Sequence, residues 1–220
     1  MPAIAEICAF SAEAAIMALS AGAPRIELCD APEKHGISPP ESWFQIIPAQ
    51  NHAELAVMVR PRGGSFCMSE SEVEIMEQEI IRLRTQKQAG AVVFGLLTPE
   101  NEIDVPACQK LLKASADLPC VFHRAFDIVP HPEKSLQILI NLGFQRLLCG
   151  LPLTNLIKLK EIANGRITIM PGGGVRSHNV KSFLDAGFTE IHSSARAGGL
   201  LPDPNELKHI IAACKGSSSF

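Results

Sequence analysis

Eight short apolar runs recur along the chain, each rich in Val, Ile and Leu and long enough for one β-strand. The runs are almost continuously apolar, which is typical of strands buried on both faces of a parallel sheet. The spacing between them leaves room for one crossover helix each time. The predicted strands are Ile4–Cys8, Arg25–Cys29, Leu55–Arg60, Ala91–Gly95, Pro119–Arg124, Arg146–Cys149, Ile167–Met170 and Thr189–Ser193.

Helix-start signals lie between these runs. Ser69 and Glu72 form a capping box ahead of apolar residues at helical spacing, and Asp203 followed by Pro204 opens the last helix in a similar manner. The weakest helical pattern runs from Pro39 to Ile47, and the other predicted starts are Ser11, Asp104, Thr154 and Ser177.

Glycine ends a predicted helix before every second strand, at Gly22, Gly90, Gly143 and Gly187. Eight alternating units without a linker predict one domain over residues 1–220, a single (β/α)8 barrel of the TIM type that is somewhat short. The alternative is an open doubly wound sheet. It would need a glycine-rich dinucleotide motif after the first strand, which the chain lacks.

Charge and hydropathy limit the classes of binding partner that the sequence suggests. The chain has 220 residues and a net charge of -3 without a basic block, so neither nucleic acid nor an anionic membrane surface is indicated. The apolar N-terminal stretch resembles a secretory signal, but Glu6 and Glu13 interrupt it and no Lys or Arg precedes Arg25. We expect a cytoplasmic protein with a small partner and no membrane association.

The seven cysteines show no C-x-x-C spacing, which argues against a zinc ribbon or a thioredoxin-type motif. Free thiols in a reducing compartment are the simpler interpretation. Cys108 and Cys214 fall on helices and Cys120 lies early in a strand, so these three read as packing residues, whereas Cys67 is a weak candidate near the barrel mouth.

The first two strands end alike, in Glu6-Ile7-Cys8 and Glu27-Leu28-Cys29. Because side chains alternate along a strand, the Glu and the Cys of each triplet point the same way, and adjacent strands would set Cys8 beside Cys29. Two converging thiolates favour a soft ion such as Cu(I). Each cysteine alone would also fit ordinary core packing.

The third strand leads into Arg60-Pro61-Arg62-Gly63-Gly64, where two arginines and a glycine pair are typical of an anion clamp. The alternative is that Arg60 and Arg62 neutralise Glu6 and Glu27 inside the barrel.

Polar residues also follow strands five, seven and eight, where a TIM barrel carries its active site. His123 and Arg124 end strand five with Asp127 close behind, and His123 is a general base, a metal ligand or a structural group. Hydroxyl-rich and glycine-rich loops after the last two strands are typical of a phosphate site, although three glycines also fit a tight turn. These loops contain Gly172, Gly173 and Gly174, and His192, Ser193 and Ser194.

Taken together these motifs resemble the CutC family of copper homeostasis proteins over almost the whole chain. The most specific segments are Arg60-Pro61-Arg62-Gly63-Gly64 and Phe122-His123-Arg124-Ala125-Phe126-Asp127. The resemblance implies a cytoplasmic (β/α)8 barrel, often a homo-oligomer, in which Cys8 and Cys29 match the cysteines that bind Cu(I) in some members. The chain departs from the family pattern at Ser65 and at Leu148-Cys149-Gly150, and its loops after strands six and eight look short.

Two hypotheses follow for the function. The first is copper homeostasis, with Cu(I) bound by Cys8 and Cys29. The second is an enzyme of the lyase, aldolase or isomerase type, acting on a small phosphorylated or carboxylated metabolite. In the enzyme, Glu27 or His123 would move a proton. The residues holding its anion or otherwise facing its ligand would be Glu6, Arg60, Arg62, Arg124, Gly172, Gly173, Gly174 and His192.

Overall fold

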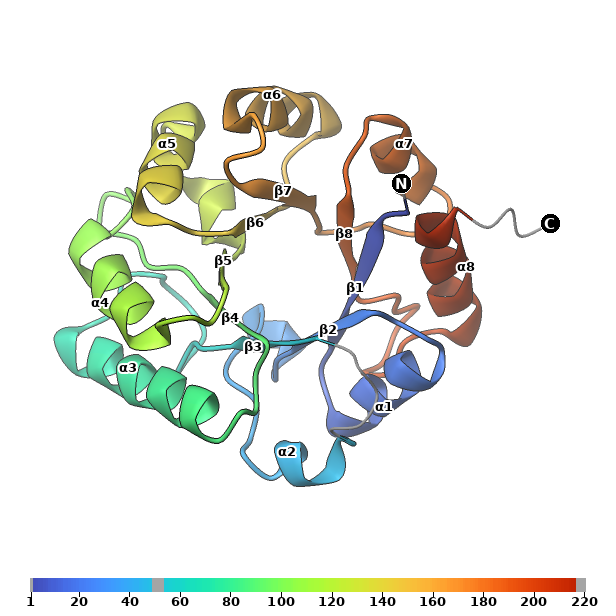
Figure 1. Ribbon diagram of the computed structural model, residues 1–220, viewed down its shortest axis with the longest axis horizontal. Coiled ribbons are helices and arrows are strands. Elements are labelled where there is room, and N and C mark those ends of the chain that lie inside the picture. The colour runs from blue at the N-terminus through green and yellow to red at the C-terminus, as the bar shows by residue number, and fades with distance from the viewer. Residues whose placement is uncertain (1, 49–53, 217–220) are drawn as a thin grey trace.

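The structure of the protein, a computed structural model, describes residues 2–48 and 54–216. Eight parallel strands surround a central axis with the helices outside them, which confirms the predicted (β/α)8 barrel (Figure 1). The strands are hydrogen-bonded in the order β7-β6-β5-β4-β3-β2-β1-β8. They are β1 (Ile4–Ala9), β2 (Arg25–Leu28), β3 (Glu54–Met58), β4 (Ala91–Phe94), β5 (Cys120–Phe122), β6 (Arg146–Cys149), β7 (Thr168–Pro171) and β8 (Glu190–Ser193).

The helices cover the outer face of the sheet. No helix among the described residues is both long enough and apolar enough to cross a bilayer. Two short 3-10 helices, η1 (Pro32–Lys34) and η2 (Arg124–Ile128), follow β2 and β5. The α-helices are α1 (Ala12–Ser20), α2 (Trp43–Ile46), α3 (Glu70–Thr85), α4 (Val105–Ser115), α5 (Pro132–Leu142), α6 (Leu153–Ala163), α7 (Val180–Asp185) and α8 (Pro204–Lys215).

Four of the predicted helix starts are confirmed as N-caps, because Ser11, Ser69, Asp104 and Asp203 each accept a hydrogen bond from a first-turn backbone N–H. Ser69 and Glu72 complete both halves of the capping box. The other two were wrong. Helix α6 already begins at Leu153 behind Pro152, and α7 begins only at Val180, because the Ser177 hydroxyl donates to Glu206 instead of capping a helix.

The predicted glycine positions hold at three of four helix ends. Gly22, Gly143 and Gly187 have φ of 82°, 92° and 76°, the left-handed conformation that glycine adopts without strain. Gly90 does not have a positive φ, since α3 ends at Thr85 and the left-handed position falls earlier, on Lys87 with φ of 55°.

The core has two layers. Residues such as Ile7 and Ile26 point outward from the strands and pack against the helices. The alternate residues fill the barrel interior, where a second apolar cluster consists of Cys8, Cys29, Ala56, Met58, Ala91, Val93, Val121, Leu148 and Met170. This inner cluster draws on β1 to β7, whereas the inward side chains of β8 are polar.

Because all eight strands are parallel, their carboxyl ends meet at one rim of the barrel. The register pairs Glu6 with Arg25 on β2 and with His192 on β8, and pairs Cys8 with Glu27. The chemistry-bearing residues of three neighbouring strands are thereby brought to one side of the barrel, near that rim.

Candidate functional site

The thiols of Cys8 and Cys29 lie side by side at the carboxyl ends of β1 and β2. The Cys29 backbone N–H donates to the Ala9 carbonyl at 3.1 Å, which carries the strand pairing one residue beyond β2. Their Sγ atoms are 3.4 Å apart, and the residues are 5% and 1% exposed. The structure thus places the two sulfur atoms next to each other, as predicted, although the strand register is offset by two residues and pairs Cys8 with Glu27 instead of Cys29.

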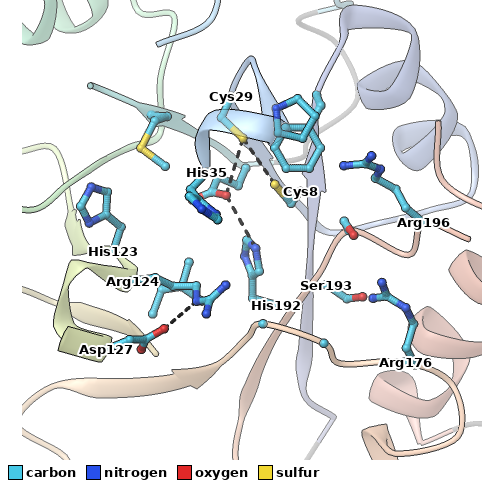
Figure 2. A pocket seen from close by; sticks show the side chains of 18 of the residues that line it. Cys8, Cys29, His35, His123, Arg124, Asp127, Arg176, His192, Ser193 and Arg196 are labelled. Atoms are coloured by element: carbon cyan, nitrogen blue, oxygen red, sulfur yellow. Dashed lines mark hydrogen bonds and ion pairs between the residues drawn. The ribbon is translucent and has the colours of Figure 1, made fainter. Parts of the chain in front are cut away.

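A cavity of about 460 Å³ opens over this pair at the carboxyl rim (Figure 2). Its wall comes from residues of β1, β2, β3, β6 and β8 and from the segments that follow β1, β2, β3, β5, β7 and β8. The lining residues are Cys8, Phe10, Glu27, Cys29, Pro32, His35, Met58, Phe66, His123, Arg124, Asp127, Ile128, Leu148, Gly173, Gly174, Arg176, His192, Ser193, Ser194 and Arg196.

The environment of the two thiols keeps them protonated. The pKa of Cys8 lies well above its ordinary value because of its hydrogen bond with Cys29, its burial and the charge of Glu27. Burial also raises the pKa of Cys29, and Glu27 adds to the effect. The nearest Glu27 oxygen, Oε2, lies 4.0 Å from the Cys29 sulfur.

Glu6 is the ionised carboxylate beneath the thiols. It is 1% exposed, and it accepts a hydrogen bond from Arg25 Nε at 2.6 Å while its other oxygen lies 2.7 Å from His192 Nδ1. Burial alone would raise the pKa of Glu6, but His192 and Arg25 outweigh it and hold that pKa below its ordinary value. This carboxylate therefore keeps its charge inside the barrel.

Arg25, the buried partner of Glu6, was not predicted from the sequence. Arg25 is 1% exposed, also pairs with Glu190 and donates to the Met170 sulfur at 3.2 Å. Arg146 in turn donates to Glu190 at 2.9 Å. The signal was present in the sequence, since Arg25 alternates with Glu27 and Cys29 on one strand face just as Glu190 alternates with His192.

His192 lies between two carboxyl groups. Burial would lower its pKa, but Glu27, Cys8 and Glu6 raise it well above the ordinary value, so the ring carries a positive charge. Its Nε2 lies 3.7 Å from Glu27 Oε2. Burial raises the pKa of Glu27 against the opposing charge of His192. Glu27 is thus a carboxyl group whose charge depends on this imidazolium.

Two overlapping sets of side chains among the described residues could hold a metal ion, each with ligand atoms within 4.8 Å of one another. One set is Cys8, Cys29 and Glu27. The other is Glu6, Glu27 and His192, but there Arg25 already occupies one oxygen of Glu6 and the imidazole is charged. The set with Cys8 and Cys29 therefore offers soft sulfur ligands that no cation already occupies.

The structure corrects the expectation that Arg60 and Arg62 neutralise Glu6 and Glu27, since Arg25 takes that role for Glu6. The guanidinium of Arg60 donates to the backbone carbonyls of Lys34, Gly36 and Gly64, and that of Arg62 pairs with Glu72.

Arg60 and Arg62 are also outside the described cavity lining. Each guanidinium is used to fix the loops after β2 and β3.

His123 lines the cavity as a neutral imidazole. Its Nδ1 accepts a hydrogen bond from the Ala125 backbone N–H at 3.2 Å, so its proton lies on Nε2. Burial, with the charge of Arg60, lowers its pKa to about 3. Nε2 is buried and has no hydrogen-bond partner among the described residues.

Arg124 sits against two glycines. A Cβ on Gly150 would come within 2.8 Å of its Nη2, and one on Gly173 within 3.0 Å of its Cζ. Asp127 accepts from its Nε at 2.7 Å. Gly172 has a packing role instead, because a Cβ there would meet Leu148 Cδ1 at 2.5 Å.

Several lining residues were not singled out from the sequence, chiefly Phe10, His35, Arg176 and Arg196. They lie in the connections after β1, β2, β7 and β8, where no periodic pattern indicates which side chains turn inward. Their closeness to the predicted strand ends was the available signal.

Comparison with known proteins gives relatives over most of the chain. Residues 3–197 match the sequence model of the CutC family. The human copper homeostasis protein cutC homolog is 41% identical over 202 residues, which cover 87% of this chain and 73% of the human protein. The family protein CutC of Photorhabdus laumondii is 42% identical over 199 residues, or 86% of this chain and 79% of that protein.

Solved structures agree with the fold. A crystal structure of a CutC protein from Streptococcus agalactiae has a TM-score of 0.81 and 34% identity, covering 87% of this chain and 98% of that one. Phosphoribosylanthranilate isomerase from Thermotoga maritima has a TM-score of 0.65 at 19% identity, over 97% and 99% of the two chains. The second likeness is one of fold alone.

Replacing Arg25 by Met should lower the free energy of unfolding by about 3–5 kcal/mol, because the buried carboxylates of Glu6 and Glu190 lose their shared cation. Urea unfolding at neutral pH measures the loss. Lys181→Met is the control: its exposed pair with Asp185 should contribute less than about 1 kcal/mol. Equal losses in the two variants would contradict a structural role for the buried pair.

Neutral His123 should make stability fall in mild acid. Below about pH 6.5 the unfolded chain binds a proton at this site, whereas the folded chain does not until the pH approaches its folded pKa of about 3. Relative to His123→Asn, the wild type should therefore lose about 2 kcal/mol of unfolding free energy when the pH falls from about 7.5 to about 5.

Urea unfolding at the two pH values tests this, with His209→Asn on the exposed face of α8 as the control. A pH-independent difference for His123→Asn would show instead that the ring titrates with the same pKa in the folded and the unfolded chain.

Proposed function

The chain belongs to the CutC family of copper homeostasis proteins, and on that premise we propose that it binds Cu(I) through Cys8 and Cys29. The observation that carries the proposal is the thiol pair itself, two buried free cysteines whose sulfur atoms are 3.4 Å apart at the floor of a cavity. This separation is less than twice a metal–sulfur bond of about 2.3 Å, so one ion can contact both sulfur atoms.

The kind of donor favours Cu(I) over harder ions. Thiolates are soft ligands that select Cu(I), whereas Mg²⁺ and Ca²⁺ require several oxygen ligands. The thiol set offers two sulfur atoms and one Glu27 oxygen, and Met58 and Phe10 add apolar surface beside it. Such a low-coordinate, largely apolar site suits an ion that needs few ligands.

Charge balance supports the same ion. Both thiols must lose a proton to bind a metal, since the thiolate is the ligand. One Cu⁺ and two thiolates together carry a single net negative charge. The imidazolium of His192, which lies against Glu27, is a buried cation close enough to stabilise it.

We further propose that the protein works in the cytoplasm. All seven cysteines are free thiols, including the pair with sulfur atoms at 3.4 Å. An oxidising compartment would favour a disulfide between sulfur atoms this close, whereas a reducing one keeps them available for a metal.

Anaerobic titration with Cu(I) against a competing chelator tests the proposal. Cys8→Ser and Cys29→Ser should each lower the affinity more than about 100-fold, because loss of a metal ligand should exceed the 10–100-fold cost of losing an outer-shell partner.

Cys67→Ser is the matched control and should bind as the wild type does, since Cys67 lies outside the described lining of the cavity. Undiminished affinity in both Cys8→Ser and Cys29→Ser would refute the site.

A further inference from the structure

Three arginines line the cavity besides the thiols, and we call them the arginine cluster: Arg124 on η2, Arg176 after β7 and Arg196 after β8. Figure 2 shows Arg124 on one side of His192 and the other two on the opposite side. All three come from the carboxyl rim, where ligand sites of this fold lie. None of them takes part in the proposed copper site.

The charge of the arginine cluster is only partly balanced. Asp127 pairs with Arg124, and the charge of Arg176 helps to lower the pKa of Glu206, but no described carboxylate forms a direct ion pair with Arg176 or Arg196. Arg176 donates to the Val175 carbonyl, and Arg196 donates to the Gly199 carbonyl while its guanidinium lies 5.0 Å from the centre of the Phe10 ring. Each guanidinium keeps most of its five N–H donors for a ligand.

The backbone between Arg124 and Arg176 is open to a ligand. Gly173 and Gly174 have φ of 73° and 106°, and nothing lies within 4 Å of the position a Cβ would take on Gly174. The guanidinium of Arg124 rests on Gly173, since a Cβ there would lie 3.0 Å from its Cζ. Consecutive backbone amides in such a glycine turn form a concave anion site.

Two buried polar groups on the same cavity lack partners. Glu27 Oε1 and His123 Nε2 have no hydrogen-bond partner among the described residues, although Glu27 and His123 are only 3% and 4% exposed. Unpaired groups at this depth are rare, because each costs free energy comparable to a lost hydrogen bond. Glu27 Oε1 can accept a hydrogen bond and His123 Nε2–H can donate one, so both suit the hydroxyl groups of a ligand.

From these observations we infer that the cavity binds a small phosphate monoester. Its phosphate lies against Arg176 and the amides of Gly173 and Gly174, with Arg124 and Arg196 at its flanks, and its hydroxyl-bearing body reaches toward Glu27 and His123. Guanidinium groups match the geometry of phosphate oxygens, and their excess charge suits a dianion better than a monocarboxylate. This inference does not depend on copper binding.

The size of the cavity supports an organic ligand. Its volume of about 460 Å³ lies in the usual range for small-molecule sites. A water molecule takes up about 30 Å³ of liquid, so the space exceeds what one inorganic ion fills.

Calorimetric titration of the metal-free protein tests the site with inorganic phosphate, glycerol 3-phosphate, glycerol and acetate as probes. Glycerol 3-phosphate should bind more tightly than phosphate, and glycerol and acetate should bind more weakly than phosphate. Arg176→Gln and Arg196→Gln should each weaken phosphate binding about tenfold or more, since each removes a charge-assisted contact. Arg84→Gln, on the exposed end of α3, is the matched control and should bind as the wild type does.

Three results would overturn the inference: no phosphate binding by the wild type, equal affinities in Arg84→Gln and both cavity variants, or acetate binding as tightly as phosphate. Arg176 and Arg196 are half-buried in loops, so we expect their variants to fold, and circular dichroism checks this.

The double variant Cys8→Ser with Cys29→Ser should still bind phosphate, and Arg176→Gln should still bind Cu(I). Failure of one site therefore leaves the other to be judged separately.

Discussion

An ionised carboxylate inside a β-barrel requires cations beside it, and Glu6 has one on each neighbouring strand. Removing a carboxylate from water costs several kcal/mol even after relaxation, and only close, well-oriented partners offset that cost. The register supplies them directly, since β1 pairs Glu6 with Arg25 of β2 and with His192 of β8. Because Glu6 fixes Nδ1 of His192, the other ring nitrogen faces Glu27, which in turn lies beside the Cys29 sulfur.

This chain of contacts divides the barrel interior into two sectors. The inward residues of β8, β1 and β2 carry the buried charges, whereas those of β3, β4 and β5 are mostly apolar, as Met58, Val93 and Val121 show. Arg25 on β2 and Arg146 on β6 both pair with Glu190 on β8, and so they reach the polar sector from opposite sides. The thiols lie where the two sectors meet, with apolar neighbours on one side and Glu27 on the other.

Strand positions and the thiol pair could be predicted from the sequence because both depend on local alternation. The side-chain period of a strand and the spacing of a parallel sheet predict that the thiols of Cys8 and Cys29 face the same side of adjacent strands. The two side chains also bridge a register offset of two residues, since Cys8 is paired with Glu27. The same alternation places Arg25 on the inward face of its strand. Its burial was not predicted, because a basic residue at the start of an apolar run is typical of a strand boundary. Alternation alone does not show which charges pair across strands, because that depends on register.

The loops were harder to predict for a different physical reason. Arg60 and Arg62 stand in the most distinctive motif, yet their guanidinium groups are used by backbone carbonyls and by Glu72. Arg176 and Arg196 lie just behind the glycine-rich and hydroxyl-rich segments that the sequence points to, yet nothing in the sequence shows that their own side chains line the cavity. A loop side chain's direction is set by a few backbone torsions and by the hydrogen bonds it meets, not by a periodic pattern.

The geometry also explains how one cavity could hold both proposed sites, one for a soft cation and one for an anion. The floor presents thiols, which do not attract phosphate, and the arginine cluster presents guanidinium groups, which do not ligate a metal. Cu⁺ between two thiolates would carry a net negative charge and repel a phosphate. The charged His192 ring lies below the cysteines in Figure 2, with Arg124 on one side and Arg176 and Arg196 on the other, and it would reduce that repulsion. Its position depends on Glu6, so the buried ion pairs beneath the thiols set the electrostatics of both halves of the cavity.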